Sequence, residues 1–258
     1  MLPFNALKSR ANRVDPMEQI HNIRDLGGLS AHAGKRIKSG CLYRSGNPAG
    51  ASAIDIARLQ EMRFDAIIDL RSEAEKSPAE TSFGRQFRWV SQPVFDGEFS
   101  MEGVMRSLKG KQPEDMEAFM VQMYRDFALK CQPAFARFFK LVEAGGTLLY
   151  HCTAGKDRTG FATMLLLSAL GVDEQTIKAD YLESNAQNQR FNERALVIAS
   201  RANVAPELVW PLLEVRATYL DAARNAIDRD HGGMDLYLRQ TLQADVELLR
   251  RNYLDVTV

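Results

Sequence analysis

The feature that most constrains the fold of this chain is a short loop enclosed between an apolar run and a helical pattern. Residues 147–150 read Thr-Leu-Leu-Tyr, and residues 151–160 read His-Cys-Thr-Ala-Gly-Lys-Asp-Arg-Thr-Gly. Apolar residues then recur at helical spacing as far as Gly171. The order predicts a buried strand over 147–151, a tight loop and a helix that begins near Arg158. Such a unit favours an α/β fold.

Residues 152–158, which we call the cradle loop, have the composition of an anion site. If the loop joins a strand to a helix, its backbone N–H groups and the positive helix end converge on one point. That field favours the thiolate form of Cys152, and the planar guanidinium of Arg158 can grip two phosphate oxygens. The arrangement suits hydrolysis of a phosphomonoester through a phosphocysteine intermediate. A merely buried cysteine is the alternative, but it leaves Lys156, Asp157 and Arg158 unexplained.

The remaining pattern predicts a twisted, mostly parallel sheet flanked by helices, followed by a helical elaboration without further strands after Asp173. We expect an N-terminal arm over 1–20 and a single domain over 21–258, with a turn-rich segment at 22–29 and a flexible piece at 95–115. Strands are expected at 41–46, 64–70, 87–94 and 147–151. Helices are expected at 51–63, within 116–144 with a break at Pro133, and at 158–171, 173–184, 186–201, 205–228 and 242–253.

The charge and cysteine content narrow the class of protein. Thirty-three basic residues balance thirty-three acidic ones, so net charge favours neither nucleic acid nor an anionic membrane as a partner. The three cysteines, Cys41, Cys131 and Cys152, are widely spaced and suit neither a disulfide framework nor a zinc site. The N-terminus lacks a signal-peptide pattern, and no segment approaches the ~20 apolar residues of an integral membrane segment. We expect a cytoplasmic protein, with export by a non-Sec route left open.

The cradle loop resembles the signature of the cysteine-based tyrosine phosphatases, in which His-Cys is followed by five residues, Arg and Ser or Thr. Three further segments, at 22–29, 42–46 and 69–71, occur in the same order in the atypical bacterial tyrosine and lipid phosphatases. Those proteins are similar to this chain from about residue 20 to the C-terminus. The resemblance implies a cysteine-phosphatase-like fold, no metal and no organic cofactor. It also implies activity on phosphotyrosine proteins, often with phosphoinositides or serine/threonine phosphates as further substrates.

The same resemblance assigns roles to the residues of the loop. Cys152 would be the nucleophile, Arg158 would bind the phosphoryl group, and Thr159 would donate to the departing thiolate. His151 would order the loop rather than transfer protons. Two members of the family use a helical lid, and residues 186–228 are where this chain would hold one. The substrate-binding residues would be those of the loop itself: Thr153, Ala154, Gly155, Lys156, Asp157 and Arg158.

The general acid has two candidates. Protonation of the leaving group needs a carboxylic acid within hydrogen-bond reach of the ester oxygen. Asp157 lies inside the loop, as in the atypical bacterial branch, whereas Asp96 follows the strand expected at 87–94, where more typical tyrosine phosphatases carry a mobile acid loop. The Trp-Pro-Asp motif of that mobile loop is absent here. We favour Asp157 and keep Asp96 open, since Asp96 can also be an ordinary turn residue before Gly97.

Several further charged residues could support the loop or its ligand. Asp69 could bond Arg158 or the amides of the loop, or simply cap its own turn. The pairs Arg24-Asp25 and Arg44-Ser45 could brace the loop from behind. Lys156 is expected at the rim of the site, where an additional positive charge would favour polyphosphorylated head groups.

Two other functions remain open at this point. One is a sulfur-transfer or arsenate-reducing enzyme, which also uses a cysteine loop but needs a second, resolving cysteine. The other is a catalytically silent phosphate-binding module. The intact Cys152 and Arg158 argue against both.

Overall fold

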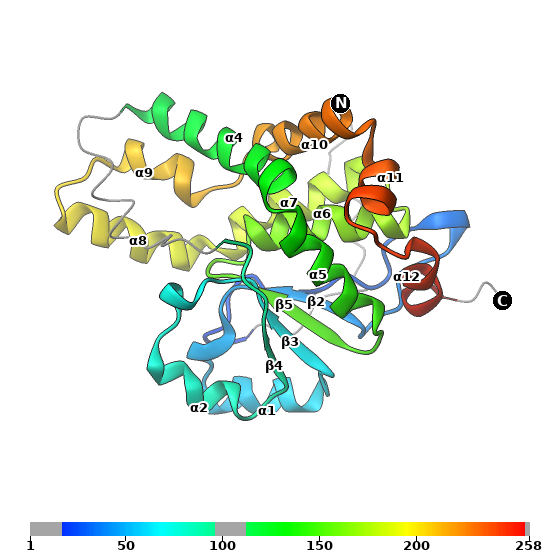
Figure 1. The fold of residues 1–258 in the computed structure, drawn as a ribbon. Helices are drawn as coiled ribbons and strands as arrows, with labels where there is room; N and C mark the ends of the chain where they lie inside the picture. Colours follow the sequence, from blue (N-terminus) through cyan, green and yellow to red (C-terminus); the bar gives the residue numbers. More distant parts are fainter. Residues whose placement is uncertain (1–16, 96–111, 256–258) are drawn as a thin grey trace, which may run out of the picture.

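A five-stranded sheet forms the centre of the computed structural model, which describes residues 17–95 and 112–255. Its strand order is β1-β2-β5-β3-β4, and Figure 1 labels β2, β5, β3 and β4. Only β1 is antiparallel to its neighbour, and the other neighbouring pairs are parallel. The predicted mostly parallel sheet is therefore confirmed. The strands are β1 (Arg24–Asp25), β2 (Leu42–Ser45), β3 (Ala66–Asp69), β4 (Trp89–Ser91) and β5 (Leu148–His151).

Helices cover both faces of this sheet, as the alternation of its side chains requires. Leu149 and Ile67 face a cluster with Leu59 of α1 (Ala53–Glu61) and Phe83 of α2 (Thr81–Gly84). Tyr150 belongs to the larger core on the other face. That core includes residues of α5 (Gln132–Glu143), α6 (Arg158–Leu170) and α12 (Val246–Tyr253).

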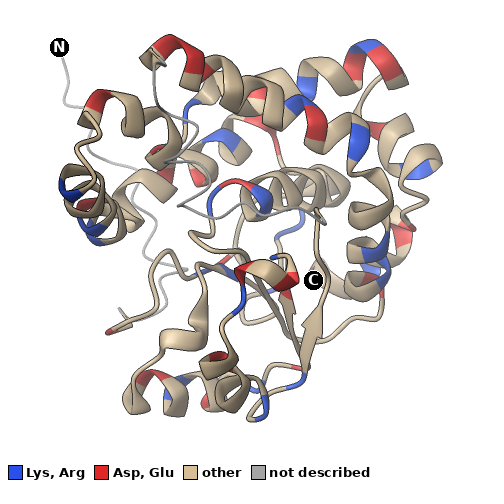
Figure 2. Cartoon of the chain, turned by 60° about the vertical axis from the view of Figure 1, so that its left-hand side comes forward, with Lys and Arg blue, Asp and Glu red and all other residues tan. Residues whose placement is uncertain are grey.

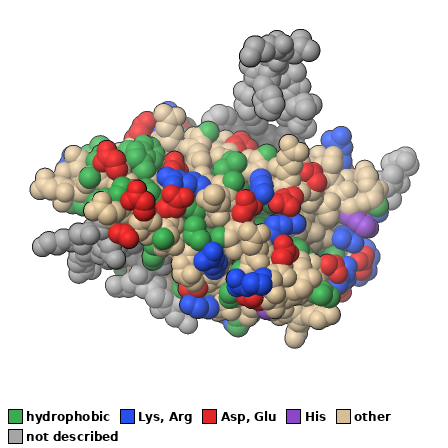
Figure 3. Space-filling model, turned by 90° about the horizontal axis from the view of Figure 1, so that it is seen from above, with side chains coloured by type: hydrophobic (Ala, Val, Ile, Leu, Met, Phe, Trp, Pro, Cys, Tyr) green, Lys and Arg blue, Asp and Glu red, His purple; other side chains and the backbone are tan. Residues whose placement is uncertain are grey.

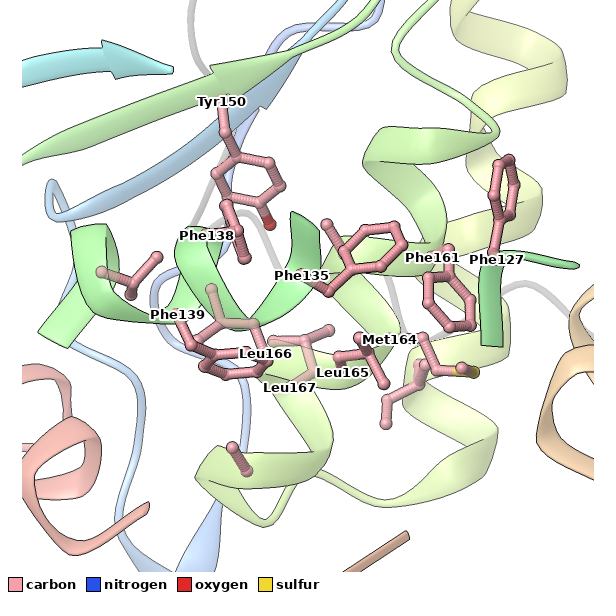
Figure 4. Close-up of a cluster of buried hydrophobic side chains, with 14 of the residues drawn as sticks. Phe127, Phe135, Phe138, Phe139, Tyr150, Phe161, Met164, Leu165, Leu166 and Leu167 are labelled. Atoms are coloured by element: carbon pink, nitrogen blue, oxygen red, sulfur yellow. The ribbon is translucent and has the colours of Figure 1, made fainter. Parts of the chain in front are cut away.

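Aromatic side chains fill the larger core (Figure 4). Phe161 of α6 packs edge-on against Phe135 of α5, with ring centroids 4.8 Å apart, and Phe138 packs in the same way on Tyr150. Phe127 comes from α4 (Pro113–Lys130). The loop helix α6 is thus held on all sides, with nearly every residue buried. This packing fixes the position of its first residue, Arg158.

The chain after α6 is helical, as predicted, but two details differ. The helix expected over 205–228 is divided into α9 (Pro206–Leu213) and α10 (Ala217–His231). Between them, the side chain of Asn185 bonds both the N–H and the C=O of Val215, which removes that residue from the helical ladder. A short α11 (Met234–Leu236) and a π-helical turn η6 (Tyr237–Thr241) also precede α12. The other helices of this region are α7 (Glu174–Gln187) and α8 (Gln189–Arg201).

The N-terminal region holds a further difference from the sequence prediction. The segment at 22–29, predicted only as turns, includes the two-residue strand β1, in which Arg24 pairs with Arg44 of β2. So short a strand has too few residues to show the alternation by which strands are recognised. Its effect is to bring Asn22 and Arg24 beside the end of β2.

Charged side chains are distributed over the surface in both signs. Figure 2 shows Lys and Arg interspersed with Asp and Glu along the helices. The face seen in Figure 3 likewise shows blue and red side chains intermixed. Within 17–95 and 112–255, no helix combines the length and apolar character needed to cross a membrane.

Candidate active site

The cradle loop lies at the carboxyl ends of the three central strands. In the sheet register, Ser45 of β2 and Asp69 of β3 both lie opposite His151, the last residue of β5. Cys152 follows directly and is 2% exposed. The loop ends at Arg158, where α6 begins. The loop is therefore placed at the positive end of a buried helix, as the sequence predicts.

The peptide groups of the loop are oriented by partners behind it. The carbonyl of Thr153 accepts from the N–H of Asn47 at 2.9 Å. The carbonyls of Ala154 and Gly155 both accept from Asn22 Nδ2, at 3.0 and 2.9 Å. Because the N–H of a peptide group points opposite to its C=O, the amides that follow these carbonyls point to the other side of the loop. Successive amides aimed in this way form an anion-binding concavity.

Two glycines allow this close packing. Gly155 has a φ of +67°, a conformation that favours glycine, and a Cβ there would lie 2.3 Å from the carbonyl oxygen of Ser45. A Cβ on Gly160 would meet Tyr181 Cδ2 at 2.9 Å. Both glycines thus serve backbone conformation and close approach.

Arg44 braces the loop from inside the protein. Its side chain is fully buried, and Nη2 donates to the carbonyl of Gly155 at 2.9 Å. Its Nη1 lies 2.6 Å from Oδ2 of Asp180 on α7, and Nε of Arg24 lies 2.7 Å from Oδ1 of the same carboxylate. Burial alone would raise the pKa of Asp180, but the charges of Arg24 and Arg44 together bring it below its ordinary value. The predicted bracing by Arg44 is thus present, through the unforeseen carboxylate Asp180.

The other charged residues considered as braces act elsewhere. Asp25 accepts from the N–H groups of Gly27 and Gly40 and holds its own turn. Asp69 accepts from the backbone N–H and the guanidinium of Arg71, so it caps its own turn and does not bond Arg158.

Glu75 fixes the orientation of Arg158. Nη1 and Nη2 of Arg158 donate to the two carboxylate oxygens of Glu75, each at 2.6 Å. Burial alone would lower the pKa of Arg158, but the bond from Glu75 raises it above its ordinary value. Glu75 is itself held by the N–H and hydroxyl of Ser72 at 3.0 and 3.1 Å. The sequence analysis assigned no role to Glu75, although its spacing from Ser72 is that of a capping box.

This contact decides which edge of Arg158 remains for a ligand. Glu75 occupies the end of the guanidinium that carries Nη1 and Nη2. Within the described ranges the Nε–H of Arg158 has no protein partner. A guanidinium can bind oxyanions along this second edge as well, so Arg158 can hold a phosphoryl group and Glu75 together.

Asp157 lies in a pair of contacts that use both of its oxygens. Oδ2 accepts from Nζ of Lys156 at 2.6 Å, and Oδ1 accepts from the hydroxyl of Tyr124 on α4 at 2.9 Å. Lys156 is 4% exposed, so its side chain does not project from the rim into solvent. The reason is that the adjacent carboxylate folds the lysine side chain inward.

Thr159 and His151 border the nucleophile. The hydroxyl of Thr159 is buried and, within the part of the chain that the structure describes, has no hydrogen-bond partner. It is therefore available to the Cys152 sulfur or to a ligand. His151 Nδ1 lies 3.1 Å from the carbonyl oxygen of Cys152. Burial lowers the pKa of His151 to about 4, so the ring is neutral near pH 7 and suits the ordering role expected for it.

Asp96, the other candidate acid, lies outside the described residues. Within the described residues, 17–95 and 112–255, no group of three or more His, Cys, Asp or Glu side chains could hold a metal ion.

Comparison with known proteins shows the family to which this chain is similar. A family model described as "Tyrosine phosphatase family" matches residues 15–255, which include every side chain of the site described above. A protein of Cupriavidus necator named as a tyrosine-protein phosphatase is 52% identical over 237 residues, which are 92% of this chain and 87% of that protein. The triple specificity protein phosphatase PtpB of Mycobacterium tuberculosis is 31% identical over 265 residues, covering 89% of this chain and 95% of PtpB.

Two crystal structures of TpbA from P. aeruginosa, one of them a complex with phosphotyrosine, also align with the chain. Their TM-scores are 0.31 and 0.32, at 19% and 17% identity. The alignments cover 57% and 84% of this chain, and 71% and 88% of the TpbA chains.

Proposed function

The chain belongs to the tyrosine phosphatase family, and we propose that it hydrolyses phosphotyrosine through a phosphocysteine intermediate. The observation that carries the proposal is the orientation of Arg158. Glu75 takes the Nη1 and Nη2 end of the guanidinium and leaves the Nε–H edge for a phosphoryl group, and the charge of Cys152 acts on the same guanidinium. A phosphoryl group bound there would have its phosphorus next to the sulfur. We expect the enzyme to work in the cytoplasm, where thiols remain reduced.

The reaction divides into two displacements. In the first, the thiolate sulfur of Cys152 bonds to phosphorus as the ester P–O bond breaks, and Asp157 gives a proton to the departing oxygen. In the second, water attacks the phosphocysteine while Asp157 takes up a proton. The S–P bond breaks, and the thiolate that departs can accept a hydrogen bond from Thr159. Arg158 and the loop amides hold the phosphoryl oxygens in both steps.

Asp157 is the general acid in this proposal because it lies in the cradle loop next to Arg158, and because Tyr124 and Lys156 fix its orientation. Asp96 remains the alternative. An acid carried on a separate segment would leave Asp157 as a structural partner of Lys156.

The substrate range is proposed to extend to phosphoinositides and to serine or threonine phosphates. The support is the name of PtpB as a triple specificity phosphatase, together with the family resemblance. The burial of Lys156 removes the rim charge as an argument for lipid substrates.

We also propose that α8 and α9 act as the lid expected within 186–228 of a single domain. The start of α8 lies near the cradle loop, since Phe191 stacks on His21 at 4.9 Å. His21 accepts from the N–H of Gly46, whose neighbour Asn47 donates to Thr153. The part of α8 remote from the cradle loop packs with α9 on Met116 of α4. These side chains form a small separate cluster: Met116, Ala195, Ala199, Val209 and Leu213.

The positions of the other cysteines disfavour a sulfur-transfer or arsenate-reducing reaction. Cys41 precedes β2, at the end of the sheet remote from the cradle loop, where its carbonyl accepts from Leu148. Burial raises the pKa of Cys131 to about 11, which keeps it a thiol near pH 7. We therefore propose neither as a resolving thiolate for Cys152.

The function is tested by initial rates on a phosphotyrosine peptide, a phosphoserine peptide and phosphoinositide vesicles. We expect hydrolysis of the phosphotyrosine peptide by the wild type and none by Cys152→Ser. The serine variant should still bind that peptide, because Arg158 and the loop amides remain. Hydrolysis by Cys152→Ser at a rate near that of the wild type would refute the phosphocysteine mechanism. Binding without turnover by the wild type would support the silent phosphate-binding module instead.

A further inference from the structure

A chain of hydroxyl groups leads from α7 through α4 to the cradle loop. The hydroxyl of Tyr181 donates to that of Tyr124 at 2.6 Å, and the hydroxyl of Tyr124 donates to Asp157 Oδ1 at 2.9 Å. Tyr181 is 1% exposed and Tyr124 is fully buried. These tyrosines lie 57 residues apart and meet only in the folded protein.

The direction of this chain follows from the chemistry of its last member. An ionised carboxylate only accepts hydrogen bonds, so Tyr124 must donate to Oδ1. The oxygen of Tyr124 is then available as an acceptor, and Tyr181 donates to it. Burial raises the pKa of both phenols well above the ordinary value, so both remain protonated donors near pH 7.

We propose that Tyr124 is a positioning residue for the general acid Asp157 and that Tyr181 holds Tyr124 in its donating orientation. The inference rests on the acid role proposed for Asp157. Because Tyr124 donates to Oδ1 in either protonation state of Asp157, the transferable proton is carried on Oδ2, where it takes the place of the hydrogen bond that Oδ2 accepts from Lys156 Nζ in this structure. That proton passes to the ester oxygen in the first displacement, and Oδ2 takes one from water in the second.

The two tyrosines are themselves held by the elements that brace the loop. Tyr181 packs against Gly160 of α6, where any Cβ would collide with the tyrosine ring. Its neighbour on α7, Asp180, bonds Arg44, which donates to Gly155 in the loop. Helix α7 therefore fixes the loop backbone through one residue and the acid side chain through the next.

The test compares single hydroxyl deletions within one aromatic cluster. Tyr124→Phe removes the donor to Asp157, and Tyr181→Phe removes the donor to Tyr124. Tyr219→Phe is the matched control, because its ring lies 5.8 Å from that of Tyr124 but its hydroxyl bonds the carbonyl of Pro211. Asp157→Asn serves as the reference. Each variant is assayed on two substrates. One is a phosphotyrosine peptide, whose leaving group is poor, and the other is nitrophenyl phosphate, whose leaving group is activated.

We expect Tyr124→Phe to lower kcat on the phosphotyrosine peptide roughly ten-fold, a part of the ~10²–10⁴ that a positioned general acid contributes. The kcat on nitrophenyl phosphate should stay within about two-fold, since that leaving group needs little protonation. Tyr181→Phe should show the same selective loss to a smaller extent, and Tyr219→Phe should show none. Adding Tyr124→Phe to Asp157→Asn should cause no further selective loss, because both act on one step.

The possible failures can be told apart. If Asp157→Asn shows no selective loss on the peptide, the proposed acid is wrong. If Asp157→Asn shows it but Tyr124→Phe and Tyr181→Phe behave like Tyr219→Phe, the acid stands and the positioning inference is overturned. Thermal unfolding of each variant identifies a folding defect. Should Tyr124→Phe fail to fold, Tyr181→Phe decides. It keeps the Tyr124 hydroxyl but removes the hydrogen bond that holds this hydroxyl in its donating orientation. A selective loss on the peptide then supports the inference, and the absence of that loss overturns it.

Discussion

His151 illustrates how one buried residue links the site to the stability of the fold. It lies between the sheet and the cradle loop, with its ring 4.9 Å from that of Trp89 and its Nε2 3.8 Å from Asp69 Oδ1. Burial disfavours the charged ring more than Asp69 favours it, so the pKa falls from 6.5 to about 4. Between these values the unfolded chain binds a proton that the folded protein does not.

The free energy of unfolding should therefore fall as the pH is lowered from about 6.5 to about 4. The stability that His151 contributes is fully present above its unfolded pKa and amounts to roughly 3 kcal/mol. Urea unfolding at a series of pH values measures this slope. His151→Gln should flatten it, whereas His32→Gln, at an exposed position, should leave it unchanged. An equal slope in His151→Gln and the wild type would assign the pH dependence to other groups.

At the same scale, the sequence revealed the residues of the loop and missed their partners. Cys152, Arg158 and Asp157 could be found because one continuous segment carries them. Glu75 lies 83 residues from Arg158, and Tyr124 lies 33 from Asp157. A single sequence contains no signal for contacts at such separations. It also suggested an exposed Lys156, because the bond between neighbouring side chains depends on the loop conformation.

At the scale of elements, the long periodic helices and the central strands were predicted closely, and the short pieces were not. Strands β2, β3 and β5 and helix α6 lie where the apolar pattern placed them. The strand β1 and the break at Val215 depend on partners, Arg44 and Asn185, that lie elsewhere in the chain. These are the pieces whose position is decided by tertiary contacts rather than by local pattern.

The junction between α7 and α8 carries a feature that bears on the proposed lid. Asn188 is fully buried, and neither its Nδ2 nor its Oδ1 has a hydrogen-bond partner in the described structure. A buried polar group without partners costs about 1–3 kcal/mol. This cost would be relieved if α8 moved and exposed Asn188 to water, as the opening of a lid requires.

Asn188→Leu should therefore raise the melting temperature and hold the lid closed. We expect lower kcat/KM on a phosphotyrosine peptide, which must pass the lid, and a smaller change on nitrophenyl phosphate. The ratio of the two rates separates this effect from a general loss of activity. A stabilised variant with unchanged rates on both substrates would show that α8 is a fixed part of the core.

At the scale of the whole molecule, charge gives little long-range guidance to substrates. The chain has 33 basic and 33 acidic residues, and Figure 2 shows both signs distributed along the helices. Long-range steering of anions needs a single-sign field that extends beyond the Debye length, about 8 Å at physiological ionic strength. In the proposed function, the attraction for phosphate therefore comes from the loop amides and Arg158 at contact distance.

The salt dependence of substrate binding should then be weak and similar for substrates of different charge. We expect KM for a phosphotyrosine peptide and for phosphoinositides to rise by no more than about three-fold between roughly 0.05 and 0.3 M salt. Lys156→Ala should lower kcat on both substrates alike, because its ammonium bonds Asp157 and does not project from the surface. A steep salt dependence confined to phosphoinositides, and lost in Lys156→Ala, would instead show that this lysine leaves Asp157 to bind the additional phosphates. In that case the lipid preference would be created by rearrangement of the loop rather than by the surface charge of the molecule.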